Sequence, residues 1–171
     1  MKNKNNKYSL YYVAKMIKKQ SNNKKVVMIG GSFDLIHVGH VRILEKAKKH
    51  GNILVVCLNS DAHIKTYKPA FRPIVSEMQR AEIVNNLKSV DYTFITESTE
   101  KGLYDLEIYN TLKPDVLILI KEKDRYKSRI LTAKKLMGQF PDLKVIFIEP
   151  IYTDVSTTKI IEKILASQNT N

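Results

Sequence analysis

The chain has 171 residues, of which 43% are hydrophobic, and a formal net charge of +12. This length fits one domain with one buried core. No apolar run approaches the roughly 20 residues that cross a bilayer, so we expect a cytoplasmic protein with no membrane partner. The only cysteine, Cys57, lies in the apolar run ILVVCLN, which excludes an internal disulfide and favours a buried small hydrophobe.

The positive charge is concentrated near the N-terminus. Residues 1–25 carry eight lysines and no acidic residue, which leaves a net charge of +4 for the rest of the chain. Such an arm could attract a polyanion, but solubility or a coding bias explains it more simply. We therefore do not expect nucleic acid as a partner. The composition divides the chain into a basic arm and helix over residues 1–23 and a second region over residues 24–168.

In chain order, the spacing of Leu10, Val13 and Ile17 first predicts a short amphipathic helix. Five short apolar runs then predict strands over residues 25–29, 52–59, 92–96, 115–120 and 144–149. Helical patterns separate or follow them over residues 40–51, 76–89, 103–113, 128–140 and 156–167, the last with Ser156 as its N-cap. The segment 60–75 holds two prolines and is predicted to be a long loop.

Apolar strands that alternate with helices are typical of a parallel sheet buried on both faces. We therefore predict an α/β fold: a single doubly wound domain with a five-stranded parallel sheet, Rossmann-like, preceded by a short N-terminal helix. Ligands of such sheets bind outside the carboxyl ends of the strands, where the strand order reverses. The end of the first strand is the natural candidate.

The stretch GGSFDLIHVGH, residues 30–40, lies at that end. His37 and His40 are three residues apart at the start of the predicted helix, so both imidazoles project over a turn whose backbone N–H groups attract anions. Gly39, between them, is expected to leave room for a ligand against the backbone. A lone histidine here would more often be a surface or capping residue, and a metal pair would need a third ligand that the sequence does not suggest nearby.

GGSFDLIHVGH resembles the GxFDxxHxGH signature of the cytidylyltransferase-like nucleotidyltransferases, also called HxGH nucleotidyltransferases. The similarity continues through LNSD at 58–61, RPIVSEMQR at 72–80, SVDY at 89–92 and VSTTKIIEKI at 155–164, and so covers about residues 24–165. Within the family, the sequence is most similar to the nucleotidyltransferase domain of the ADP-heptose synthases.

The resemblance implies roles for individual residues. His37, His40 and Lys65 would be catalytic, and Asp34 would orient the turn after the first strand. The nucleotide would be bound by Gly31, Ser32, Phe33, His37, His40, Lys68, Arg80, Ser156 and Thr157. No protein residue is expected to hold a resident metal. Without the resemblance, Lys65, Lys68 and Arg80 would be interpreted as solvated surface residues.

The implied reaction transfers a nucleoside monophosphate from ATP or CTP to a small phosphorylated acceptor, a heptose 1-phosphate in the first interpretation, with Mg²⁺ arriving on the triphosphate and pyrophosphate leaving. Glycerol 3-phosphate, ethanolamine phosphate and FMN remain alternative acceptors, and a regulatory module that binds nucleotide without catalysis remains an alternative function. Dimers among relatives leave a homodimer open.

The sequence departs from the family at two places. After the fourth predicted strand, IKEKDRY at 120–126 replaces a glycine-rich, KGGDY-like turn that helps to form the base pocket in the heptose enzymes. The choice between ATP and CTP is therefore open. Ile151 stands where glycerol-phosphate enzymes carry an arginine, which weakens that alternative.

Overall fold

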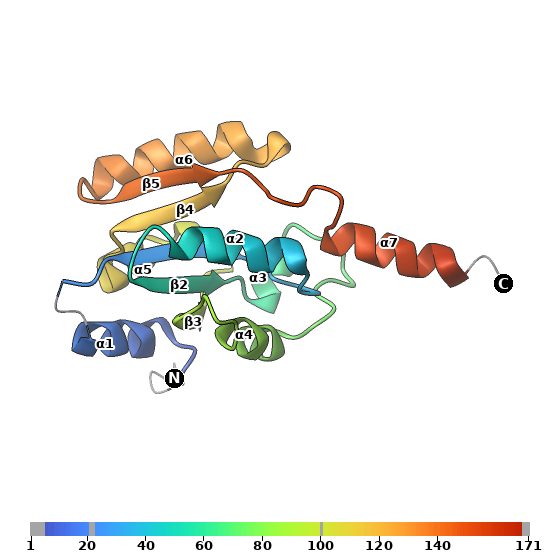
Figure 1. The fold of residues 1–171 in the computed structure, drawn as a ribbon, viewed down its shortest axis with the longest axis horizontal. Helices are drawn as coiled ribbons and strands as arrows, with labels where there is room; N and C mark the ends of the chain where they lie inside the picture. Colours follow the sequence, from blue (N-terminus) through green and yellow to red (C-terminus); the bar gives the residue numbers. More distant parts are fainter. Residues whose placement is uncertain (1–5, 21–22, 100, 169–171) are drawn as a thin grey trace.

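The protein forms a five-stranded, all-parallel sheet with helices on both faces (Figure 1). The computed structural model describes residues 6–20, 23–99 and 101–168, apart from the side chains of Asp124 and Gln168. The strands are β1 (Val26–Gly31), β2 (Ile53–Leu58), β3 (Tyr92–Ile95), β4 (Val116–Ile120) and β5 (Lys144–Ile148), in the spatial order β3-β2-β1-β4-β5. The predicted Rossmann-like α/β fold is confirmed.

The helices follow the predicted alternation closely. They are α1 (Leu10–Gln20), α2 (Val38–Lys48), α3 (Asp61–Lys65), α4 (Glu77–Asn85), α5 (Leu106–Leu112), α6 (Tyr126–Gln139) and α7 (Thr157–Gln168), with short 3-10 turns η1 (Gly102–Tyr104) and η2 (Lys123–Arg125). None of the helices in the described part of the chain is both long and apolar enough to span a membrane.

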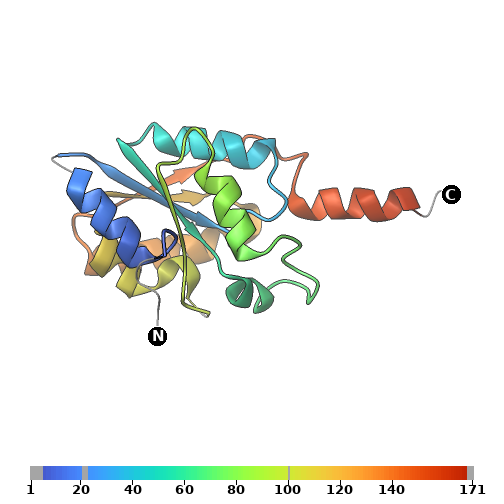
Figure 2. The same cartoon turned by 90° about the horizontal axis from the view of Figure 1, so that it is seen from below.

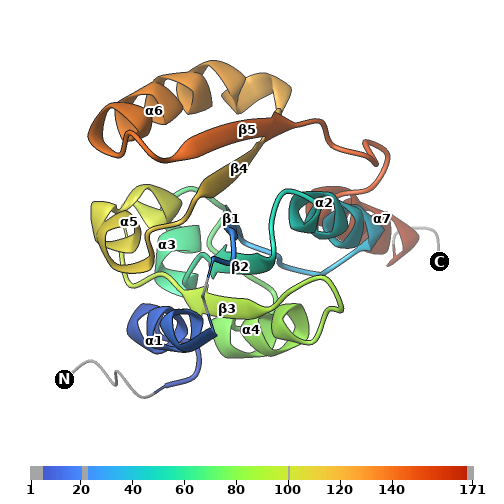
Figure 3. The same cartoon turned by 60° about the vertical axis from the view of Figure 1, so that its left-hand side comes forward.

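The continuous apolar strands have one core on each side of the sheet. Val26 and Met28 of β1 face α1, α5 and α6, whereas Val27 and Ile29 face α2 and α4 (Figure 3). All four side chains are at most 5% exposed, as expected for strands covered on both faces.

The strand order places the carboxyl ends of β1, β2 and β4 next to one another. β1 pairs with β2 from Val26–Ile53 to Gly31–Leu58, and on its other side it pairs with β4. The connection after β1 leads to β2 on one side, and the connection after β3 returns to β4 on the other. The order therefore reverses between β1 and β4, where ligands of such sheets bind.

The N-terminal helix is an integral part of the core. Leu10, Val13 and Ile17 of α1 are buried against α5 and β3, and the N–H of Ile95 donates to the carbonyl of Tyr8 (N···O 2.9 Å). The division at residue 23 therefore separates a basic sequence from a less basic one, but α1 shares its core with the rest of the sheet. Residues 1–5 and 21–22 of the basic stretch lie outside the described residues.

The structure differs from the predicted elements within segment 60–75, which is not wholly a loop. Residues 61–65 form α3, because the hydroxyl of Ser60 caps it by accepting from the N–H of His63 (3.1 Å). At the other end of the chain, α7 projects away from the sheet, and its first turn lies nearest the rest of the molecule (Figures 1 and 2).

Candidate active site

The turn between β1 and α2 has an unusual backbone. Phe33 and Leu35 have φ angles of +50° and +44°, in the left-handed region that non-glycine residues rarely adopt. A Cβ on Gly31 would lie 2.9 Å from the ring of Phe33, so glycine is needed there for this turn. Such strain persists only where surrounding contacts hold it, and it is typical of binding sites.

The side chain of Phe33 is buried next to His40. Its side chain is 5% exposed, and its ring centroid lies 5.2 Å from that of His40. The buried ring therefore packs under the second histidine, so the nucleotide contact predicted for Phe33 would have to come from its backbone.

The imidazole rings of the two motif histidines pack against each other at the start of α2, with an interplanar angle of 34°. Their ring centroids are 3.9 Å apart, and the N–H of His37 donates to Nδ1 of His40 (3.3 Å). Because Nδ1 of His40 accepts a hydrogen bond, the ring proton of the neutral imidazole is on Nε2. His40 is thereby prepared to donate from Nε2 to a ligand.

Gly39, between the two histidines, lies against the ring of His37. A Cβ on Gly39 would lie 2.9 Å from Cε1 and 3.0 Å from Nδ1 of His37. The ring of His37 occupies this space in the structure, and the ligand contact expected at Gly39 stays a prediction. Gly39 allows the imidazole of His37 to lie against the first turn of α2.

Both histidines are held in the neutral form. Burial lowers the pKa of His37, whose Nδ1 is buried without a hydrogen-bond partner among the described residues. Burial, and then the neighbouring His37, lower the pKa of His40 to about 4, although Asp34 opposes this. Two neutral imidazoles can therefore act as hydrogen-bond donors near pH 7 without a proton being taken up first.

The low pKa of His40 predicts that the free energy of unfolding depends on pH. Between pH 6.5 and 4 the unfolded chain binds a proton on this residue that the folded chain does not, so stability decreases as the pH falls through this window. We expect His40 to contribute a loss of about 2 kcal/mol between pH 7 and 5. Urea unfolding at both pH values, for the wild type and for His40→Gln, measures this. An equal pH dependence in the two proteins would contradict it.

Asp34 joins the motif to the segment that follows α3. Its carboxylate, 1% exposed, accepts from Nε of Arg72 (2.6 Å) and from the N–H groups of Ile74 and Val75 (3.0 and 3.1 Å). Burial alone would raise the pKa of Asp34, but these donors outweigh it and hold the pKa below its ordinary value. Asp34 thus links the turn after β1 to residues 72–75, and its role in orienting that turn stays a prediction.

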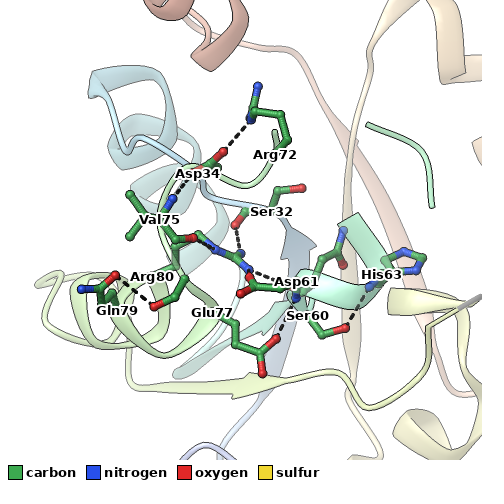
Figure 4. A network of polar contacts seen from close by, with 12 residues as sticks. Ser32, Asp34, Ser60, Asp61, His63, Arg72, Val75, Glu77, Gln79 and Arg80 are labelled. Atoms are coloured by element: carbon green, nitrogen blue, oxygen red, sulfur yellow. Dashed lines mark hydrogen bonds and ion pairs between the residues drawn. The ribbon is translucent and has the colours of Figure 1, made fainter. Parts of the chain in front are cut away.

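Arg80 joins three segments of the chain: the motif turn, the end of β2 with the start of α3, and the residues just before α4 (Figure 4). Its side chain is 1% exposed, and it donates to the carbonyls of Val75 (2.9 Å), Ser32 and Asn59 (2.9 Å) and to the carboxylate of Asp61 (2.6 Å). These bonds use four of the five N–H groups of a guanidinium. Arg80 is therefore neither solvated surface nor an open phosphate-binding group, since at most one N–H remains for a ligand.

The predicted lysines lie on the segment after β2. Lys65 is the exposed last residue of α3, and its catalytic role stays a prediction. Lys68 is half-buried, and its pKa is lowered by burial and then by the nearby Arg125 and Arg72. Lys68 therefore lies among other cations, as expected for a place that receives an anion.

The start of α7 reaches back to the motif. The hydroxyl of Thr157 donates to the carbonyl of Asp34, and Cγ1 of Val155 lies 3.7 Å from the Cβ position of Gly39. Ser156 caps the helix by accepting from the N–H of Lys159 (3.2 Å). The structure thus brings a second helix N-terminus beside the histidine pair, although the hydroxyl of Thr157 is engaged with the protein.

Three contacts around the site were not predicted. The hydroxyl of Tyr67 lies 2.8 Å from Oγ of Ser32, and Nδ2 of Asn59 donates to it at 2.8 Å. Arg72 is the buried partner of Asp34. Arg72 and Asn59 lie within the segments that carry the resemblance, but Tyr67 lies in a segment whose pattern gave no signal beyond a loop.

Comparison with known proteins identifies the family. A sequence model of the family described as Cytidylyltransferase-like matches residues 28–163, which include the motif and the start of α7. The chain belongs to the cytidylyltransferase-like family of nucleotidyltransferases. The match spans the sheet from β1 to β5, so the family assignment covers the whole candidate site.

Individual relatives agree with this assignment. The bifunctional protein HldE of Campylobacter jejuni strain RM1221 is 40% identical over 145 residues, which are 85% of this chain and 29% of that protein. HldE of Syntrophotalea carbinolica is 41% identical over 142 residues, 83% of this chain and 27% of that protein. The chain therefore spans less than a third of the length of these relatives.

Solved structures share the fold. A lipopolysaccharide core biosynthesis protein from Thermoplasma volcanium GSS1 superposes with a TM-score of 0.59 at 24% identity, covering 77% of this chain and all of the other. The pantoate-beta-alanine ligase of Francisella tularensis has a TM-score of 0.59 at 15% identity, covering 91% and 76%. At these identities the likeness concerns the fold alone.

Proposed function

We propose that the protein transfers a nucleoside monophosphate from ATP or CTP to a phosphorylated sugar, with a heptose 1-phosphate as the first candidate acceptor and pyrophosphate as the second product. The observation that carries the proposal is the closely packed, neutral histidine pair at the N-terminus of α2, with Nε2 of His40 left as a donor. The similarity to the bifunctional protein HldE, together with the resemblance to the ADP-heptose synthases, supports the heptose acceptor.

The reaction needs no protein nucleophile. The acceptor phosphate has a second pKa of about 6, so its oxygen is already anionic near neutrality. This oxygen forms a bond to the α-phosphorus while the bond from that phosphorus to the bridging oxygen of the β-phosphate breaks, and the electron pair leaves with pyrophosphate. The protein must align the two phosphates and stabilise the charge that develops on them.

The described residues are suited to that task. His40 would donate from Nε2 to the α-phosphate, and the N–H groups at the start of α2 would lie beside the same anion. Lys65 and Lys68 would neutralise the departing pyrophosphate. Arg80 and Asp34 would act indirectly, because they hold the turn that carries the histidines.

Magnesium would enter as part of the triphosphate substrate. The carboxylate within the motif, that of Asp34, is already engaged by Arg72 and by two backbone N–H groups, so it does not fit the role of a metal ligand. Among the residues that the structure describes, there is no group of three or more His, Cys, Asp or Glu side chains that could hold a metal. The phosphates themselves would supply most of its ligands.

A panel of acceptors crossed with ATP and CTP tests the proposal. Heptose 1-phosphate, glycerol 3-phosphate, ethanolamine phosphate and FMN are each incubated with either nucleotide and Mg²⁺, and pyrophosphate release is measured. We expect release with heptose 1-phosphate and one preferred nucleotide. Nucleotide binding without release for any acceptor would contradict the proposal and would favour a non-catalytic regulatory module. Release with another acceptor alone would reject the heptose assignment.

A further inference from the structure

The segment that departs from the family pattern, residues 120–126, has a defined structure at the end of β4. Arg129 of α6 donates to the carbonyl of Ile120, and its other Nη lies 3.2 Å from the carboxylate of Glu122. These contacts hold the start of η2, which contains Arg125. The segment that replaces the glycine-rich turn therefore presents an arginine from an anchored position.

Arg125 reaches across to the segment that follows β2. Its guanidinium carbon lies 5.7 Å from the ring centroid of Tyr67, a distance typical of a cation–π contact. The hydroxyl of the same tyrosine lies 2.8 Å from Oγ of Ser32 in the motif turn. Segments that follow β1, β2 and β4 thus meet through one aromatic ring, beside the point where the strand order reverses.

The positive charges of Lys68 and Arg125 near Tyr67 are not balanced by the acidic side chains that the structure describes nearby. Lys68 is close enough to Arg125 and Arg72 for both to lower its pKa after burial, and only Glu122 opposes them. Arg72, however, is neutralised by Asp34, and Glu122 is in a salt bridge with Arg129. Among the described side chains, which exclude that of Asp124, neither Lys68 nor Arg125 is in a salt bridge. Two cations held near each other in this way are stabilised by an anion placed between them.

We propose that Lys68 and Arg125 together bind a phosphate group of a substrate at the mouth of the site between β1 and β4. The inference rests on the proposed function, because it assigns these residues to one of its two phosphate-bearing substrates. The group is the phosphate of the acceptor or the terminal phosphate of the nucleoside triphosphate. Lys68 belongs to the phosphate-binding residues that the family implies, whereas Arg125 comes from the segment in which this chain departs from the family.

The test compares Arg125→Ala, Arg125→Lys, Lys68→Ala and the double Arg125→Ala/Lys68→Ala variant with the wild type. Lys127→Ala is the matched control, since it removes an exposed cation only two residues from Arg125. For each protein, kcat and the KM of each substrate are measured by pyrophosphate release. Binding of ATP, CTP and heptose 1-phosphate is also titrated separately by calorimetry, and thermal melting confirms folding.

We expect Arg125→Ala to raise the KM and the dissociation constant of one substrate by about tenfold or more, as the loss of a charge-assisted hydrogen bond would. Arg125→Lys should recover part of the affinity, and Lys127→Ala should behave as the wild type. A rise in the acceptor KM alone assigns the pair to the acceptor phosphate, and a rise in the nucleotide KM alone assigns it to the triphosphate.

Affinities that Arg125→Ala leaves unchanged for every substrate would overturn the inference, as would a wild type that binds none of the three probes. The proposed function fails differently. If the wild type binds a probe but releases no pyrophosphate with any acceptor, the activity is rejected, while the titrations of the variants still decide whether Lys68 and Arg125 bind phosphate.

Discussion

Replacing His40 with alanine is expected to lower kcat by about 10²–10³-fold, the effect of removing one preorganised donor to a developing oxyanion. The reason is that Nε2 of His40 is the donor left after Nδ1 accepts from the N–H of His37. His37→Ala should have an effect of the same order, because its ring packs against that of His40 at a centroid distance of 3.9 Å. Pyrophosphate release under saturating substrates measures both variants.

A second substitution at His40 distinguishes hydrogen-bond donation from proton transfer. His40→Gln carries an amide N–H₂ that can replace the Nε2 donor, but it cannot transfer a proton. If the neutral imidazole acts by donation, His40→Gln retains more activity than His40→Ala. If it acts as a general acid or base, the two variants are equally impaired. His50→Ala, at the other end of α2, is the control histidine and should retain full activity.

Replacing Arg80 with methionine is expected to lower the free energy of unfolding by about 3–5 kcal/mol, the usual effect of breaking a buried charged network. The variant keeps the apolar stem but leaves the carbonyls of Val75, Ser32 and Asn59 and the carboxylate of Asp61 without their donor. Urea unfolding monitored by circular dichroism gives the change. Activity should fall as well, since one of these carbonyls belongs to the motif turn.

Two further variants distinguish this structural role from a phosphate contact. Arg80→Lys keeps the charge but cannot reach four acceptors, so it should also be destabilised. If Arg80 served chiefly to bind phosphate, Arg80→Lys would be as stable as the wild type and would differ only in the KM of the nucleotide. Arg42→Met is the matched control, because the Arg42 side chain is 51% exposed in its pair with Glu45, and exposed ion pairs contribute little to stability.

The sheet could be predicted, and the candidate site placed on it, because their signals are local. A strand buried on both faces requires a continuous apolar run, and each of the five runs forms a strand. The motif residues lie within eleven consecutive positions, so their arrangement at the end of β1 follows from the strand and helix on either side. The short helix α3 was missed because five residues carry too little periodicity to be recognised.

The supporting contacts could not be predicted because they join residues far apart in the chain. Asp34 and its partner Arg72 are 38 positions apart, and Arg80 lies 48 positions from Ser32. A polar residue on a helix is by default assigned to solvent. Only the packing of α4 beneath the motif turn places the guanidinium of Arg80 in the interior.

The sequence by itself determined the fold class, the family motif and the end of the sheet where the site lies, because hydrophobic periodicity and short motifs depend on neighbouring residues. Tertiary structure alone decided how the site is built. It places the ring of His37 against Gly39 and buries the guanidinium of Arg80. It also brings Arg125 into contact with the ring of Tyr67. The physical reason is that burial and hydrogen bonding depend on distances between segments, and these distances exist only after the strands have paired.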